Sequence, residues 1–312
     1  MLRRDNTASA SHFCQLVNNF LAHAREESFE PDDACFAVAG PVEEEGTNRL
    51  VRMTNARLVV DQRELVRRTS LKHVDIMNDF EAVSYATNLL SGEDFVTLNR
   101  GSAIKGGTRV AIGAGTGLGK SILYWHERLG TYIPISSEGG HGDLPLLTEE
   151  EFLLSRFIKR EYRIREVVVY EDVLSGRGLE NIYQYLNASK FLTSPAGLSA
   201  EEISKTKRTN PCSRETFRWF VEFYARCARN FVLDALATGG LYIAGGIAAR
   251  NTDSFTDFVQ EFVRNDAYHG ILKKIPVHIV TNYDISPIGA AYGFMVRRAL
   301  ATEARRMANE ND

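Results

Sequence analysis

A glycine-rich run in the first half of the chain could bring bare backbone N–H groups close to phosphate oxygens. The glycines alternate with small residues after a short β-branched pattern that begins at Arg109, and they are Gly113, Gly115, Gly117 and Gly119. A residue without a Cβ lets a ligand approach the backbone closely, and successive N–H groups can form a concave anion site. These residues, with Thr116 among them, therefore predict a nucleotide-phosphate loop.

Two other glycine patterns nearly match this run. The dinucleotide pattern G-x-G-x-x-G would need its third glycine where the chain has Leu118 or Lys120. Residues 114–121 match a P-loop with alanine for its first glycine, but a P-loop must open a helix. The following residues, 121–134, are rich in β-formers with a turn signal at Gly130, so we expect a strand–loop–strand hairpin. A P-loop ATPase remains an alternative, in which replacing Lys120 by alanine would abolish ATP binding.

A second polar motif, Glu138-Gly-Gly-His141, offers a carboxylate and an imidazole. Its spacing matches the Glu-x-x-His of di-iron helices, but two glycines disfavour a helix here. A loop that carries these two side chains suits vicinal sugar hydroxyls better than a metal ion.

A third candidate lies at the end of an expected strand. The pattern from His73 to Met77 ends at Asn78 and Asp79, and ligands of α/β sheets bind at the carboxyl ends of strands. Asp79 could accept a hydroxyl proton, as a carboxylate does in kinase phosphoryl transfer. Alternatively, Asn78 or Asp79 could simply cap the next helix.

Four motifs follow one another along the chain, and together they are far more specific than any one alone. They are Met77-Asn-Asp-Phe80, Gly113-Ala-Gly-Thr-Gly-Leu-Gly119, Glu138-Gly-Gly-His141 and Gly239-Gly-Leu-Tyr-Ile-Ala-Gly-Gly-Ile247. In this order they resemble the bacterial-type glucokinase family over nearly the whole chain. The resemblance implies an α/β fold, that of an actin-like, ribonuclease-H-like two-domain sugar kinase.

The resemblance also implies roles for individual residues. Asp79 would be the catalytic base, and the sugar-binding residues would be Thr54, Asn55, Asn78, Asp79, Glu138, His141 and Glu171. The nucleotide would bind Gly113, Gly115, Thr116, Gly117, Gly119, Gly245 and Gly246. From the residues alone, a Thr-Asn pair could be only turn chemistry, and Glu171 could only complement a helix dipole.

A family member would phosphorylate glucose to glucose 6-phosphate with ATP, a step of glycolysis, with Mg²⁺ bridging the phosphates. No protein-held metal is expected. The alternative is a sugar-binding or regulatory homologue that does not transfer phosphate. The resemblance leaves open whether the donor is ATP, ADP or polyphosphate, and how strictly glucose is preferred over mannose or fructose.

The front of the chain departs from the family pattern. The family has a strand, an Asp-x-Gly-Gly-Thr-Asn phosphate loop and two further strands ahead of its first helix. Here Asn6-Thr7 precedes the first helical pattern, Ala10 to Ala24, without a glycine pair or an aspartate loop. We therefore expect the N-terminal phosphate loop and strands to be missing, which would leave the strand Cys35 to Ala39 with an unpaired edge.

Composition bounds the remaining possibilities. With 312 residues, 44% hydrophobic and 25% charged, the chain has the size of two domains and an ordinary globular composition. A net charge of −3 with interspersed signs argues against a nucleic-acid surface. No secretory signal or membrane span is expected, because the apolar stretch Phe231 to Ala249 is broken by glycine pairs.

Scattered cysteines without C-x-x-C pairs indicate a reducing, cytoplasmic location. A homodimer is among the assembly states left open.

The motifs divide between two expected domains. Residues 1–91 with 295–312 should form a small α/β domain truncated at its N-terminus, and residues 92–294 a large α/β domain. The large domain should contain a long helix that begins at Asn210-Pro211 and carries a core stripe. On the final helix, Arg297 and Arg298 are expected to face solvent.

Overall fold

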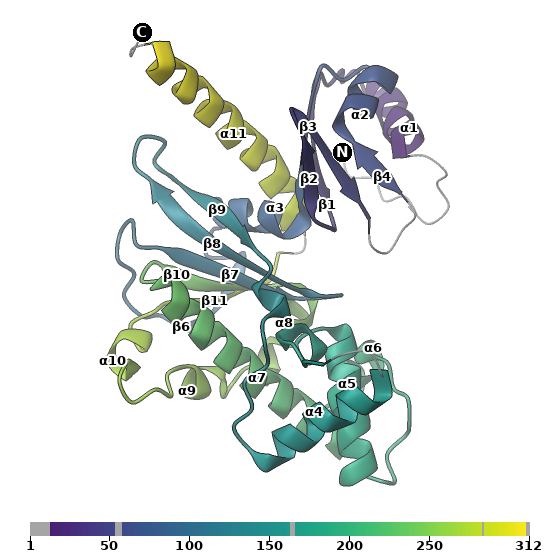
Figure 1. Ribbon diagram of the computed structural model, residues 1–312, viewed down its shortest axis with the longest axis vertical. Coiled ribbons are helices and arrows are strands. Elements are labelled where there is room, and N and C mark those ends of the chain that lie inside the picture. Colours follow the sequence, from purple (N-terminus) through teal and green to yellow (C-terminus); the bar gives the residue numbers. More distant parts are fainter. Residues whose placement is uncertain (1–12, 54–57, 163–165, 283, 310–312) are drawn as a thin grey trace. The chain divides into compact units, whose positions relative to one another are not determined.

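The computed structural model describes residues 13–53, 58–162, 166–282 and 284–309 (Figure 1). Contacts within the chain divide it into two compact units, Met1–Asn88 with Asp284–Asp312, and Leu89–Tyr283. Toward the C-terminus, the boundary between the two units falls just before helix α11 (Ile285–Asn309). The sequence suggested a boundary after residue 294. The difference arises because α11 is one continuous helix, so residues 285–294 belong with the first unit.

Small sheets form the first unit. Strands β1 (Asp33–Val38) and β5 (His73–Asn78) are a parallel pair, in register from Asp33 with His73 to Val38 with Asn78. Strands β2 (Val42–Glu45), β3 (Asn48–Arg52) and β4 (Val59–Asp61) form an antiparallel sheet. The sequence did not mark β2, because its glutamates look like a solvated turn and only backbone pairing with β3 makes it a strand.

Helices pack on these strands through apolar faces. They are α1 (Phe13–Glu26), α2 (Gln62–Arg68), α3 (Asp79–Ala86) and α11. One buried cluster joins Leu21 of α1, Val51 of β3, Leu65 of α2 and Ile76 of β5. This core fixes the end of β5, where Asn78 and Asp79 are located.

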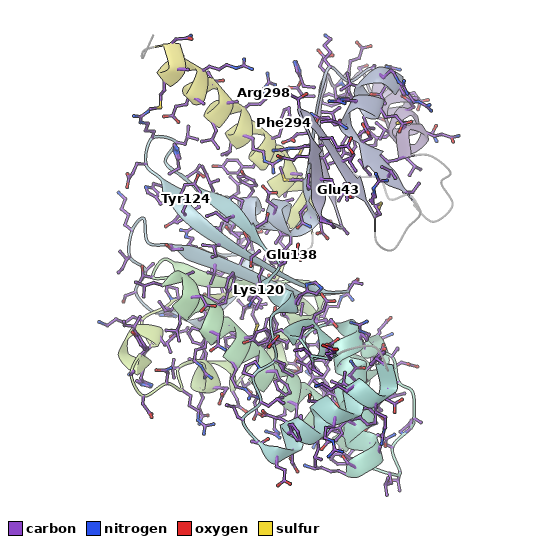
Figure 2. The ribbon with its side chains drawn as sticks, in the orientation of Figure 1. Glu43, Lys120, Tyr124, Glu138, Phe294 and Arg298 are labelled. Atoms are coloured by element: carbon purple, nitrogen blue, oxygen red, sulfur yellow. The ribbon has the colours of Figure 1, made fainter. Side chains whose placement is uncertain are left out.

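Arg297 fixes α11 to β5 and α3, which corrects the expectation that it faces solvent. Its Nη1 lies 2.8 Å from Asp75 Oδ2, and its Nη2 lies 2.6 Å from Glu81 Oε1. Burial acts to lower the pKa of Arg297, but the two carboxylates outweigh it and hold that pKa above its usual value. Helical periodicity could not reveal this role because both partners are distant in the sequence. Arg298 remains half exposed and lies 2.7 Å from Asp33 Oδ2 (Figure 2).

The second unit is built on a six-stranded sheet of described residues, in the order β6-β11-β10-β7-β8-β9. In chain order the strands are β6 (Phe95–Asn99), β7 (Arg109–Ala114), β8 (Leu118–His126), β9 (Thr131–Ser137), β10 (Gly240–Ala244) and β11 (Val277–Val280). Strands β7, β10 and β11 are parallel, whereas β6, β8 and β9 pair antiparallel with their neighbours. The carboxyl ends of β7 and β10 therefore lie side by side.

Helices and short turns complete this unit. The helices are α4 (Glu149–Tyr162), α5 (Gly176–Ser189), α6 (Ala200–Thr206), α7 (Pro211–Ala235), α8 (Gly246–Arg250), α9 (Phe258–Phe262) and α10 (His269–Leu272). The 3₁₀ turns are η2 (Gly139–His141), η3 (Tyr170–Asp172) and η4 (Thr252–Ser254). The long helix α7 runs along the sheet (Figure 1), and its apolar stripe, which includes Phe220 and Tyr224, is core as expected. Asn210 caps it by accepting from the N–H groups of Cys212 and Ser213.

The apolar stretch from Phe231 to Ala249 forms several short elements. It contains the end of α7, a left-handed residue at Leu236 (φ 43°), strand β10 and part of α8. No helix within the described ranges combines the length and the apolar character needed to cross a membrane.

A row of neighbouring aromatic and basic side chains crosses the sheet of the second unit. Arg109 Cζ lies 3.8 Å from the ring centre of Tyr132 and 5.5 Å from that of Tyr242. The row continues to His278, whose ring centre is 5.5 Å from that of Tyr242 and 4.5 Å from that of Phe95. Burial, reinforced by the charge of Arg109, lowers the pKa of His278.

We expect the free energy of unfolding to decrease as the pH falls below about 6.5, the pKa of an unperturbed histidine. Because the folded-state pKa of His278 is depressed, the unfolded chain takes up the proton first, and acidification favours unfolding. Urea unfolding between roughly pH 7.5 and pH 5 should show this slope, and His278→Gln should flatten it. An unaltered slope in His278→Gln would rule this histidine out as the cause.

Candidate functional site

The glycine run forms the tip of the hairpin between β7 and β8. The strands pair antiparallel from Arg109 with Leu123 to Ala114 with Leu118. Because the chain continues as a strand after the glycines, the expected hairpin is confirmed and a P-loop is excluded. Within the described residues, the N–H groups of Thr116 and Gly117 donate to no protein acceptor, so they are available to an anion.

The second glycine motif lies beside this hairpin. Strand β10 runs parallel to β7 with Ala244 opposite Gly113, so both motifs follow the carboxyl ends of neighbouring strands. Gly245 has a left-handed backbone (φ 91°), and a Cβ there would lie 2.5 Å from the carbonyl oxygen of Ala114. Glycine alone fits this approach, which places the start of α8 directly against the hairpin. Ligands of open α/β sheets bind at such an edge.

Glu171 is tied to the same hairpin. It lies in η3, and its Oε2 accepts a hydrogen bond of 3.0 Å from the N–H of Leu118. Ser175 Oγ donates to the carbonyl oxygen of Glu171 at 2.8 Å, and the N–H of Gly176 donates to the carbonyl oxygen of Gly115 at 2.8 Å. The carboxylate therefore acts on the neighbouring loop rather than on the dipole of its own helical turn.

The Glu138–His141 motif forms the single 3₁₀ turn η2, which excludes a di-iron helix. Glu138 Oε2 and His141 Nδ1 lie 3.6 Å apart, and their side chains are 82% and 58% exposed. The backbone beneath them is packed tightly, because a Cβ on Gly140 would lie 2.2 Å from the carbonyl oxygen of Leu118. Two open polar side chains on a rigid turn are suited to binding hydroxyl groups.

In the first unit, Asn78 is the N-cap of α3, so the cap expected at Asn78 or Asp79 is formed by Asn78. Its Oδ1 accepts from the N–H groups of Phe80 at 2.9 Å and Glu81 at 3.3 Å, and its Nδ2 donates to the carbonyl oxygen of Gly40 at 3.1 Å. With Asn78 in that role, Asp79 is the first residue of the helix. Thr54 and Asn55 lie outside the described residues.

Asp79 is exposed at the first turn of α3. Its Oδ1 accepts from the N–H of Phe80 at 2.9 Å. Desolvation by the surrounding protein raises the pKa of Asp79, although this backbone hydrogen bond acts in the opposite direction. A raised pKa strengthens a carboxylate as a proton acceptor.

Two residues with roles that the sequence did not suggest support the second unit's loops. The N–H of Ala114 donates to the hydroxyl of Tyr224 at 3.1 Å, which fixes the end of β7 to α7. Lys120 of β8, which is labelled in Figure 2, is buried, and its Nζ donates to the carbonyl oxygen of Gly139 at 3.3 Å. In the sequence, Tyr224 could not be distinguished from the other aromatic residues of the core stripe. Lys120 could have been noticed, because it is a charged residue within an alternating strand pattern.

Comparison with known proteins places this geometry in a family. The sequence model of the family described as Glucokinase matches residues 2–296. A glucokinase of Trichormus variabilis is 33% identical over 304 residues, which cover 88% of this chain and 85% of that protein.

Solved structures show the same fold. A glucokinase from an Antarctic psychrotroph superposes with a TM-score of 0.78 at 27% identity, over 92% of this chain and 87% of that one. A ROK family glucokinase from Streptomyces griseus, in complex with glucose and AMPPNP, has a TM-score of 0.59 at 16% identity, over 91% and 88% of the two chains. The fold is thus the α/β two-domain sugar kinase fold that the motif order implied. The family match extends over nearly all the described residues, and the chain therefore belongs to the glucokinase family.

Proposed function

We propose that this protein is a glucokinase that transfers the γ-phosphoryl group of ATP to the 6-hydroxyl of glucose. The observation that carries the proposal is the convergence, in the second unit, of the phosphate hairpin, Gly245, Glu171 and the turn at Glu138. Phosphoryl transfer needs positioning and charge neutralisation rather than covalent chemistry by the protein, and these parts would provide the positioning. The glucose and AMPPNP named for the Streptomyces griseus structure support the same pair of substrates.

Each part would have one task in the reaction. The N–H groups at the hairpin tip would bind phosphate oxygens, and the backbone at Gly245 and Gly246 would lie against the adenosine. Asp79 would accept the proton of the attacking 6-hydroxyl while Asn78 fixes the start of its helix. The remaining proposed sugar-binding residues are Thr54, Asn55, Glu138, His141 and Glu171.

We propose Mg²⁺ as the ion that accompanies ATP. Magnesium keeps several waters and is bound by one or two carboxylates together with substrate phosphates. In the described ranges, no three His, Cys, Asp or Glu side chains converge on one point. Held by the phosphates and water, the ion would neutralise charge on the transferred group.

We also propose that the protein works in the cytoplasm. Cys14, Cys35, Cys212 and Cys227 are all free thiols, and thiols persist where the compartment is reducing.

The direct test is to assay the purified protein for glucose 6-phosphate formation with Mg²⁺ and ATP. Mannose and fructose as acceptors, and ADP and polyphosphate as donors, complete the panel. We expect glucose and ATP to give the highest kcat/KM. Glucose binding without product would favour the alternative, a sugar-binding regulatory homologue, and the absence of both would overturn the proposal.

Replacing Glu138 or Glu171 by glutamine should mainly weaken glucose binding. A hydrogen bond from a sugar hydroxyl to a carboxylate contributes roughly 1.5–3 kcal/mol, so each variant should bind glucose about 10- to 100-fold more weakly. Titration calorimetry measures this directly, with the exposed Glu127→Gln as the matched control. Unchanged glucose affinity in both variants would remove these residues from the proposed site.

A further inference from the structure

Lys120 is a buried cation on β8, one residue after the last glycine of the phosphate hairpin. The residue is 6% exposed. Removing an ammonium group from water costs free energy unless neighbouring groups compensate. In the part of the chain that the structure describes, its contacts are to a carbonyl oxygen, aromatic rings and the thiol of Cys227 rather than to a carboxylate. A structural role alone would be served better by an apolar side chain.

The contacts of the ammonium join three elements. Nζ donates to the carbonyl oxygen of Gly139 in η2 at 3.3 Å. It also lies 4.9 Å from the ring centre of Tyr170 in η3 and 4.6 Å from that of Phe231 in α7. The aromatic faces stabilise the charge through the ring quadrupole. The ammonium also hydrogen-bonds the thiol of Cys227 in α7, so the hydrogen bond to Gly139 is the one that joins it to the Glu138–His141 turn.

That hydrogen bond acts on the turn that carries Glu138 and His141. The carbonyl oxygen of Gly139 also accepts from the N–H of Gly142 at 3.2 Å, so two donors hold it from different elements. The N–H of Tyr170 in turn donates to the carbonyl oxygen of Gly142 at 3.0 Å. Lys120 therefore lies beneath the turn, and Tyr170, the residue before Glu171, connects the end of the turn to η3.

We propose that Lys120 is a positioning residue that fixes the Glu138–His141 turn for sugar binding. The inference rests on the proposed function, because it assigns the turn to glucose. Lys120 itself does not contact the sugar. Lys120 acts by holding the carbonyl group of Gly139, so that the exposed side chains of Glu138 and His141 keep one orientation.

The experiment compares Lys120→Met with the wild type and with Lys105→Met, which replaces an exposed lysine of the same unit. Methionine retains the volume and can pack against Tyr170 and Phe231, but it cannot donate to Gly139. The Kd and KM for glucose should rise about 10-fold, the KM for ATP should stay within about 2-fold, and the thermal midpoint should hold or rise. A purely structural lysine would instead lower the midpoint and weaken both substrates together, which would overturn the proposal.

Two further measurements keep the test decisive. Hydrogen exchange at the N–H groups of His141 and Gly142 should become about 10-fold faster in Lys120→Met, while β7 and β8 stay unchanged. Hydrogen exchange needs no substrate. If the wild type did not bind glucose, the proposed function would be overturned, but exchange would still show whether Lys120 holds the turn. Lys120→Gln, whose shorter neutral side chain loses reach, should show the same loss, and Lys120→Arg should recover part of the affinity. Unchanged exchange at the turn would overturn the proposal.

Discussion

Replacing Asp79 with asparagine is expected to lower turnover by about 10²-fold or more while glucose affinity changes by only a small factor. Asparagine has nearly the same shape and can still accept the 2.9 Å hydrogen bond from the N–H of Phe80, so α3 should begin as before. It cannot accept a proton from the sugar hydroxyl. Steady-state kinetics and calorimetry on the same preparation separate the two effects, and retained turnover would exclude Asp79 as the base.

The pH profile supplies a second readout of this carboxylate. Because desolvation raises the pKa of Asp79, wild-type kcat should fall as the pH decreases through that raised value and the base becomes protonated. The residual activity of Asp79→Asn should lack this acidic limb. Asp61→Asn is the matched control, since Asp61 also accepts from a helix N–H, that of Glu64 at 3.1 Å, and asparagine is an equally good N-cap.

Replacing Gly140 with alanine is expected to reduce kcat/KM for glucose by about 10²-fold, the scale of a misplacement near 1 Å. The added Cβ would lie 2.2 Å from the carbonyl oxygen of Leu118, and this oxygen belongs to backbone that cannot rotate away. Either the Glu138–His141 turn or the phosphate hairpin must move. Both proposed binding loops would then lose their shared geometry.

The control for this variant is Gly270→Ala in α10, where nothing lies within 4 Å of the new Cβ. It should keep wild-type kinetics, and helix propensity favours alanine there. Circular dichroism should confirm that Gly140→Ala remains folded, because the clash is confined to one turn. Wild-type kcat/KM in Gly140→Ala would show that the two loops are not coupled.

Several features could be predicted from the sequence because they depend on residues that are close together in the chain. The hairpin at Gly113 followed from β-formers after the glycines, since a P-loop would have needed a helix-forming run. Ser199 and Glu202 form the capping box that their spacing predicts, with Ser199 Oγ accepting from the N–H of Glu202 and the Glu202 carboxylate accepting from the N–H of Ser199. Such patterns can be recognised in a sequence because the two partners of each interaction are only a few residues apart.

Some residues had two plausible readings until the structure separated them. Asn78 and Asp79 were both candidate caps, and the hydrogen bonds from the N–H groups of Phe80 and Glu81 assign the cap to Asn78. Glu171 could have served its own helical turn, but its carboxylate accepts from the N–H of Leu118. In each case the deciding partner depends on the path of the backbone, which residue types do not specify.

The sequence by itself determined the family, the order of the motifs and the kind of chemistry, because glycine spacing and carboxylate type are local properties of the chain. Tertiary structure alone decided that Arg297 joins Asp75 and Glu81, and that Lys120 is buried beneath Gly139. It also set Gly245 against Ala114 at the edge shared by β7 and β10. These contacts join residues far apart in sequence, or in separate elements, and their energies depend on desolvation and distance, which exist only once the sheets and helices have packed.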